Sequence, residues 1–81
     1  MSLSESELMQ AALKPFVQER RRAVLQERLE IMARYEINSL EELRQMLTNG
    51  YIPEHPGWED FVILENLEAR LEELDAYLED I

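Results

Sequence analysis

A leucine seam near the carboxyl end of the chain constrains its fold more than any other feature. Hydrophobic side chains recur there at alternating steps of three and four residues, the a/d pattern of a helix that packs lengthwise on another helix. Acidic residues fill most of the other positions. The pattern therefore predicts a long terminal helix with one face that needs a hydrophobic partner. The leucine seam consists of Leu64, Leu67, Leu71, Leu74, Leu78 and Ile81.

Helix start and stop signals divide the rest of the chain. Ser39 and Glu42 have the spacing of a capping box, which places a helix start at residue 40. Gly50 suits the left-handed residue that follows a helix, and Pro56 suits the first position of the next one. No segment alternates in the way that strands do. We therefore expect an all-α protein with helices over about 16–35, 40–49 and 57–80.

The first fourteen residues contain two conflicting signals. Ser4 and Glu7 form another capping box, so a helix could begin near Glu5. Pro15, however, lacks an N–H group and clashes with the preceding turn of a helix. Because proline is accepted in a first turn, we expect the first main helix to start at Pro15. Residues 1–14 are then a short arm, which we expect to be mobile, and residues 15–81 form one helical hairpin domain.

The two long helices have similar lengths, and the connection between them allows an antiparallel hairpin with a short intervening helix. A hairpin alone leaves much of each apolar stripe uncovered, and a chain of 81 residues without cysteine has no disulfide to stabilise it. Two hairpins packed face to face would form a homodimeric four-helix bundle and cover the stripes. We expect a homo-oligomer and favour a dimer, although leucine at both a and d positions does not distinguish it from a tetramer.

The net charge of −10 is distributed unevenly. Residues 1–35 carry six basic and five acidic residues, whereas residues 36–81 carry two basic and thirteen acidic ones. A surface this acidic repels nucleic acid and attracts basic surfaces. A soluble acidic protein without a special partner would show the same excess of acidic residues. Arg20–Arg22 is the only basic cluster, and we expect it to match the acidic last helix rather than nucleic acid.

The chain offers little for catalysis or for metal binding. His55 is the only histidine, and Glu59 or Asp60 could join it. An exposed histidine beside carboxylates is ordinarily solvated, so we assign it no role. There is no glycine-rich phosphate loop. We expect no enzyme, no cofactor and no metal site. Without a membrane-spanning run or a signal peptide, we expect a cytoplasmic protein.

Aromatic residues and prolines gather around the loop that precedes the last helix. Trp58 and Tyr51 are of the types enriched at binding hot spots. They could equally cap the core between the short and long helices, because so small a chain has few other large side chains. With the leucine seam they give a set of candidate partner-binding residues: Tyr51, Trp58, Phe61, Leu64, Leu67, Leu71, Leu74 and Leu78.

Three stretches resemble small, acidic, antitoxin-like proteins of prokaryotes. They are Tyr35-Glu-Ile-Asn-Ser-Leu-Glu-Glu-Leu43, the stretch Leu47-Thr-Asn-Gly-Tyr-Ile-Pro-Glu-His-Pro-Gly-Trp-Glu-Asp60 and the Leu/Glu-rich last helix. The resemblance as a whole extends over about residues 24–81. The resemblance implies a protein that neutralises a small toxin, often a ribonuclease with a basic groove. The helix from Trp58 to Ile81 would lie on that groove, with carboxylates in place of RNA phosphates. The sequence departs at Glu36, where the similar proteins usually have glycine. The alternative is a structural helical homo-oligomer with a scaffolding role.

Overall fold

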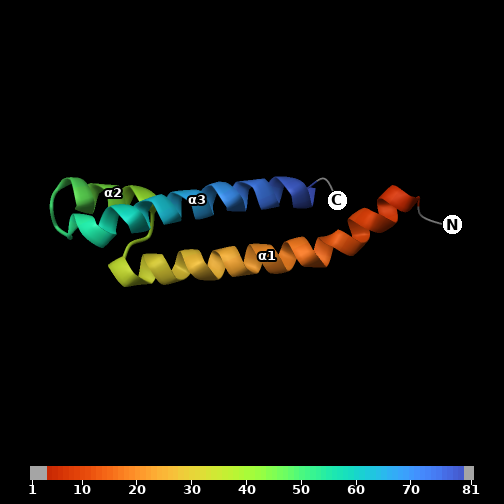
Figure 1. Ribbon diagram of the computed structural model, residues 1–81, viewed down its shortest axis with the longest axis horizontal. Coiled ribbons are helices and arrows are strands. Elements are labelled where there is room, and N and C mark those ends of the chain that lie inside the picture. Colours follow the sequence, from red (N-terminus) through yellow and green to blue (C-terminus); the bar gives the residue numbers. More distant parts are fainter. Residues whose placement is uncertain (1–3, 80–81) are drawn as a thin grey trace.

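The computed structural model describes residues 4–79 and consists of three helices. Helix α1 spans Glu5–Tyr35, helix α2 spans Leu40–Thr48 and helix α3 spans Glu54–Glu79. The described residues contain no strand, so the predicted all-α class is confirmed. The two long helices lie side by side as a hairpin, and α2 packs at the end where the chain turns back (Figure 1).

Three polar contacts set the register of the hairpin. As the residue number rises along α1, the number of its partner falls along α3, so the helices are antiparallel as predicted. The α1 partners follow one another at about heptad spacing, and hydrophobic residues lie between them. A polar group at such seam positions specifies register, because a slip would set a charge against leucine. The contacts are Arg21–Asp75 (2.5 Å), Arg28–Glu68 (3.3 Å) and Arg34–Asp60 (3.1 Å).

Helix α1 begins at Glu5 and continues through Pro15, so the prediction that the first main helix starts at Pro15 is wrong. The Ser4 hydroxyl accepts a hydrogen bond from the Glu7 N–H at 3.2 Å, as the capping box requires. Figure 1 shows that α1 bends in its N-terminal part. Proline deprives the carbonyl of Ala11 of its helical partner, but this residue is exposed and water can bond the carbonyl. Residues 1–3 lie outside the described residues.

The C-terminal end of α1 is closed by a left-handed residue that is not glycine. Glu36 has φ 54° and ψ 45°, and its N–H donates to the carbonyl of Ala33 at 3.2 Å. The next N–H, from Ile37, donates to the carbonyl of Met32 at 3.0 Å. These are the two bonds of a helix end that normally has glycine at the left-handed position. Glu36 thus occupies the left-handed position that glycine usually holds, and the chain returns Ile37 to the core.

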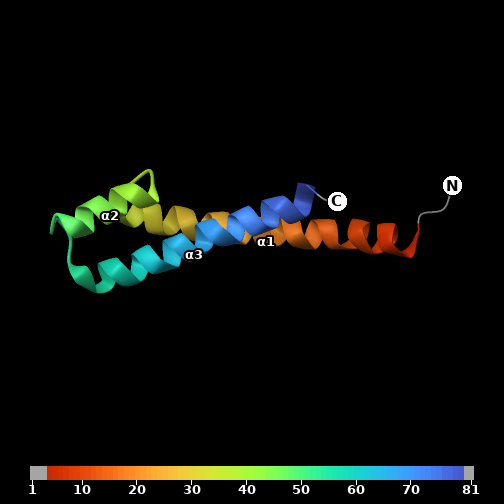
Figure 2. The same ribbon diagram turned by 90° about the horizontal axis from the view of Figure 1, so that it is seen from above.

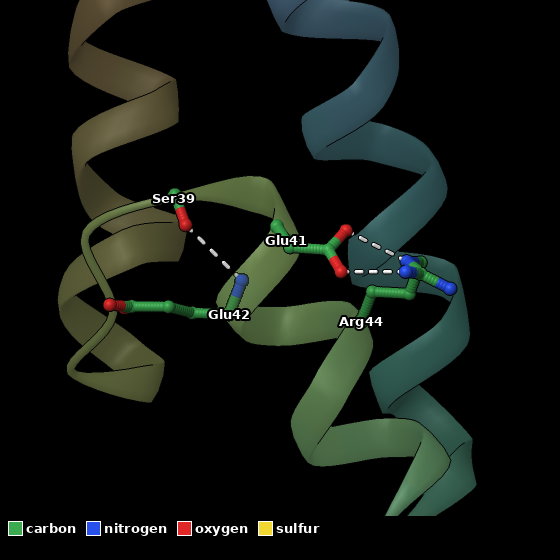
Figure 3. Close-up of polar contacts among 4 residues, drawn as sticks. All are labelled: Ser39, Glu41, Glu42 and Arg44. Carbon is green, nitrogen blue, oxygen red and sulfur yellow. Dashed lines mark hydrogen bonds and ion pairs between the residues drawn. The ribbon is translucent and has the colours of Figure 1, made fainter.

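The start of α2 follows the predicted capping box. The Ser39 hydroxyl accepts a hydrogen bond from the Glu42 N–H at 3.2 Å, and the Glu42 carboxylate accepts one from the Asn38 N–H at 2.6 Å. Figure 3 shows the first of these bonds together with the ion pair between Glu41 and Arg44, in which Oε1 of Glu41 lies 2.6 Å from a guanidinium nitrogen of Arg44. Both free N–H groups at the turn are therefore satisfied by side chains that are close in sequence.

The end of α2 and the start of α3 are also as the sequence predicts. Gly50 has φ 74°, and the N–H of Tyr51 donates to the carbonyl of Met46 at 2.9 Å. Within α3, His55 has the non-helical angles φ −114° and ψ 121°. Regular helix therefore begins at Pro56, the position predicted for it.

The hydrophobic core lies where α2 packs on the two long helices. Leu43 and Leu64 are fully buried at its centre. A Cβ atom added at Gly57 would collide with Leu47, so α2 approaches α3 closely at a residue without a side chain. The core occupies one end of a molecule of 61 × 18 × 16 Å. The buried hydrophobic residues are Val24, Ile31, Met32, Ile37, Leu43, Leu47 and Leu64.

Candidate protein-binding surface

The leucine seam lies along the inside of the hairpin. Leu64 has no exposed surface and belongs to the core, so it cannot contact a second chain in this conformation. The other described members are half-buried along the side of α3 that carries the contacts with α1. Helix α1 of the same chain thus covers much of the seam, and a partner would meet only its flanks. These half-buried members are Leu67, Leu71, Leu74 and Leu78, while Ile81 lies outside the described residues.

The three aromatic candidates occupy different environments. Phe61 is half-buried and packs against the core, so it caps the core. Trp58 packs edge-to-face on Phe61, with ring centroids 5.6 Å apart, and remains 40% exposed. Tyr51 is 76% exposed and does not cap the core. Trp58 and Tyr51 are therefore the two candidates that a second protein could reach.

An apolar patch surrounds Trp58 on the outer side of α3. Val62 and Ile63 are 50% and 42% exposed, and with Trp58 and Glu59 they line a shallow, almost wholly apolar hollow. We call Trp58, Val62 and Ile63 the α3 patch. Neither Val62 nor Ile63 is among the partner-binding residues predicted from the sequence. The sequence signal that could have revealed the patch is the four-residue step from Trp58 to Val62, which places both residues on one side of the helix, away from the leucine seam.

A row of carboxylates continues from the α3 patch along α3. Glu65, Glu72 and Glu79 follow Trp58 at successive steps of seven residues, so all four lie on one side of the helix. The three carboxylates are exposed, and none forms an ion pair with a described residue. We call them the acidic row. Since a heptad rises by about 10.5 Å, the row and Trp58 together extend over roughly 30 Å.

The three arginines of the basic cluster lie in three different environments. Arg21 pairs with Asp75, so the expected match with the acidic last helix is confirmed for this one arginine of the cluster. Arg22 instead pairs with Glu19 at 2.6 Å, and this hydrogen bond lowers the pKa of the Glu19 carboxyl below its ordinary value. Arg20 lies at a groove between the long helices, which we call the α1/α3 groove. It is lined by Arg20, Val24, Glu27, Ile63, Asn66, Leu67 and Arg70.

His55 and the buried Asp60 make separate contacts. The Nδ1 atom of His55 lies 2.7 Å from the Glu59 carboxylate, and both side chains are exposed. Asp60 points into the hairpin, where Tyr35 and Arg34 use its carboxylate. Among residues 4–79, no three His, Asp or Glu side chains gather as a set of metal ligands. In the same part of the chain, no helix is long and apolar enough to cross a membrane.

Comparison with known proteins places the chain in a family. Searches of curated proteins and of solved structures returned no match. The whole sequence, residues 1–81, matches one protein family. The chain therefore belongs to the Uncharacterized protein MJ0235 family.

Proposed function

We propose that this protein is a non-enzymatic, antitoxin-like binding module that docks on a basic partner protein through the outer side of α3. The observation that carries this proposal is the alignment of exposed Trp58 with the acidic row at heptad spacing. An aromatic anchor beside unpaired carboxylates can bury apolar area and also attract opposite charge.

The charge of α3 supports a basic partner. Helix α3 contains nine acidic residues and one arginine. Three of the carboxylates, those of Asp60, Glu68 and Asp75, already neutralise arginines of α1. The acidic row has no such role in the hairpin. Its field would speed the approach of a basic surface and repel nucleic acid.

The resemblance to antitoxin-like proteins supplies the partner class of this proposal. A small toxin with a basic RNA-binding groove would receive the acidic row where RNA phosphates otherwise lie. The α3 patch would add the apolar contact that fixes orientation, because charge pairs at the rim contribute mainly to the association rate. Toxin neutralisation would then be steric, since the groove could not hold RNA at the same time.

Assembly as a homodimer, in the form of a helical bundle, is the second part of the proposal. The radius of gyration is 17.2 Å, whereas a compact domain of this length has roughly 12 Å. So extended a protomer leaves apolar side chains uncovered, and a second copy could bury them. The alternative that the sequence leaves open, a structural homo-oligomer with a scaffolding role, requires this self-assembly but no basic partner.

Co-expression with the product of the adjacent gene tests the partner. We expect the two proteins to co-purify, growth to be rescued, and the complex to weaken as salt rises. Glu72→Lys should weaken the complex because it reverses one charge of the acidic row. Glu30→Lys makes the same charge change at an exposed position of α1 and should leave the complex intact. Absence of both a complex and a growth effect would contradict the proposed partner.

A further inference from the structure

Helix α1 is longer than its partner, and its N-terminal part has nothing opposite it. Arg21 lies against Asp75, so four further residues along α3 bring Glu79 level with residue 17 of α1. Residues 5–16 extend past the last described residue of α3, as Figures 1 and 2 show. We call residues 5–16 the α1 overhang. At 1.5 Å per residue it is about 18 Å long.

The α1 overhang carries an exposed apolar stripe. Met9, Leu13 and Phe16 follow at steps of four and three, so they share one face of the helix. Their side chains are 67%, 41% and 72% exposed, and Leu8 beside them is 54% exposed. Four large hydrophobic side chains within three turns form a face that no described residue of the same chain covers.

This stripe is continuous with the α1/α3 groove. The next steps along the same face of α1 reach Arg20, Val24 and Glu27, which line the groove. The groove adds the apolar side chain of Leu67 from α3 and that of Ile63, which lines both the groove and the hollow of the α3 patch. The molecule therefore presents, end to end on one side, an exposed apolar ridge and a groove of mixed polar and apolar lining.

The area that the chain exposes in excess of a compact monomer is similar to the area that one protomer buries in a dimer. The chain exposes 6141 Å². A compact monomer of 9.6 kDa is expected to expose roughly 5,100 Å². The excess of about 1,000 Å² is close to the roughly 800 Å² that one protomer contributes to a standard interface.

We propose that two copies pack antiparallel, with the α1 overhang of each lying in the α1/α3 groove of the other. A twofold axis near Phe16 brings the stripe of one copy level with Val24 of the second and places Phe16 close to its own mate. Each end of such a dimer has three helices, namely α1 and α3 of one copy and the α1 overhang of the other. The arrangement rests on the homodimer proposed above and specifies its surface. Full overlap of two hairpins would instead leave both overhangs bare.

The charges favour this face over the opposite one. The α1 overhang holds Glu5, Glu7 and Lys14, a net charge of −1. The α1/α3 groove holds Arg20, Arg70 and Glu27, a net charge of +1. Pairing through the other side of α3 would set one acidic row against another, and like charges repel. A second copy of this chain therefore fits the α1 overhang, whereas a basic partner fits the acidic row.

Single cysteines test the arrangement, because the chain contains none. A disulfide between two copies requires Cα atoms within about 7 Å, a condition met only near a twofold axis or along a parallel seam. Under mild oxidation, Phe16→Cys should give a covalent dimer, and Glu27→Cys should not. A crosslink at position 27 alone indicates fully overlapping antiparallel hairpins, and crosslinks at both positions indicate parallel packing. Either result, or no crosslink at all, overturns the proposal.

A charge placed in the stripe provides a second test. In sedimentation equilibrium of the full chain, Phe16→Glu should raise the dimer dissociation constant at least about tenfold. Leu29→Glu is the matched control, because Leu29 is 60% exposed and lies off the stripe, and it should leave the constant unchanged. Circular dichroism checks that both variants stay helical. If the wild type is a dimer and Phe16→Glu does not weaken it, the proposed role of the α1 overhang is contradicted but the homodimer is not. If the wild type is a monomer, the proposed homodimer is contradicted as well. Binding of a basic partner can survive either result.

Discussion

Tyr35 donates a hydrogen bond from its phenol to the carboxylate of Asp60, which joins the last turn of α1 to the first turns of α3. Arg34 contacts the same carboxylate oxygen at 3.1 Å. The Asp60 side chain is only 9% exposed, whereas that of Arg34 is 57% exposed. A buried carboxylate needs such partners, because an uncompensated charge inside a protein is strongly destabilising. This contact closes the hairpin beside the core.

Removal of the Tyr35 hydroxyl should therefore destabilise the protein. We expect Tyr35→Phe to lower the free energy of unfolding by about 1–2 kcal/mol, since Asp60 would keep only one partner. Urea unfolding followed by circular dichroism measures the change. Tyr51→Phe is the control, because Tyr51 is 76% exposed and its loss of a hydroxyl should have little effect. Equal stability of Tyr35→Phe and wild type would show that the contact is not stabilising.

The same contact predicts a loss of stability at alkaline pH. Burial, followed by the hydrogen bond to Asp60, raises the pKa of Tyr35 to about 12. In the unfolded chain the pKa is about 10. The stabilisation is then fully present below pH ~10 and is lost as the pH rises through about 12. The difference in unfolding free energy between wild type and Tyr35→Phe should shrink over this range, and a constant difference would contradict the raised pKa.

Local rules account for most of what the sequence predicted correctly. The Ser39 capping box and Gly50 each act through hydrogen bonds within a few residues, so the bounds of α2 could be read directly from them. The leucine seam and the similar lengths of the long helices predicted an antiparallel hairpin, but they could not predict its register. The register is set by pairs such as Arg21–Asp75, which lie 54 residues apart.

Competition between effects explains what the sequence did not predict. At Pro15 the cost of the missing hydrogen bond competes with the continuity of a long helix, and an exposed carbonyl that water can reach decides the outcome. The exposure of Val62 depends on where α1 lies, which spacing alone does not determine. Trp58 and Tyr51 were the residues expected to cap the core, but Phe61 packs against it, while Trp58 stays 40% and Tyr51 76% exposed.

Glycine at position 36 should stabilise the protein. Glu36 adopts φ 54°, a conformation that costs a residue with a Cβ atom about 1 kcal/mol or more and costs glycine nothing. After the greater entropy of glycine in the unfolded chain is subtracted, we expect Glu36→Gly to raise the unfolding free energy by about 0.5 kcal/mol. In contrast, Glu30→Gly within α1 should lower it by about 1 kcal/mol. Thermal unfolding compares the two, and a loss with Glu36→Gly would mean that its side chain is stabilising.

Two leucine truncations separate the core from the surface. Leu64 has no exposed area, so Leu64→Ala should lower the unfolding free energy by about 2–4 kcal/mol through lost burial and a cavity. Leu29 is 60% exposed, and Leu29→Ala should change the unfolding free energy by less than about 0.5 kcal/mol. Urea unfolding with equal slopes for both variants makes the comparison direct. A similar cost at both positions would show that Leu29 is covered in solution, which would place an assembly interface on that side.

Two glutamates four residues apart on α3 should respond to neutralisation with opposite signs. Glu68 lies 3.3 Å from Arg28 across the hairpin, whereas Glu72 belongs to the acidic row and pairs with no described residue. Glu68→Gln should therefore lower the unfolding free energy by about 0.5 kcal/mol. Glu72→Gln should raise it by a few tenths of a kcal/mol at low salt, because it removes repulsion within an acidic helix. Both effects should diminish as salt screens them. If Glu72→Gln were also destabilising, the acidic row would be contributing to the fold of the chain, and its carboxylates would not be available to a partner.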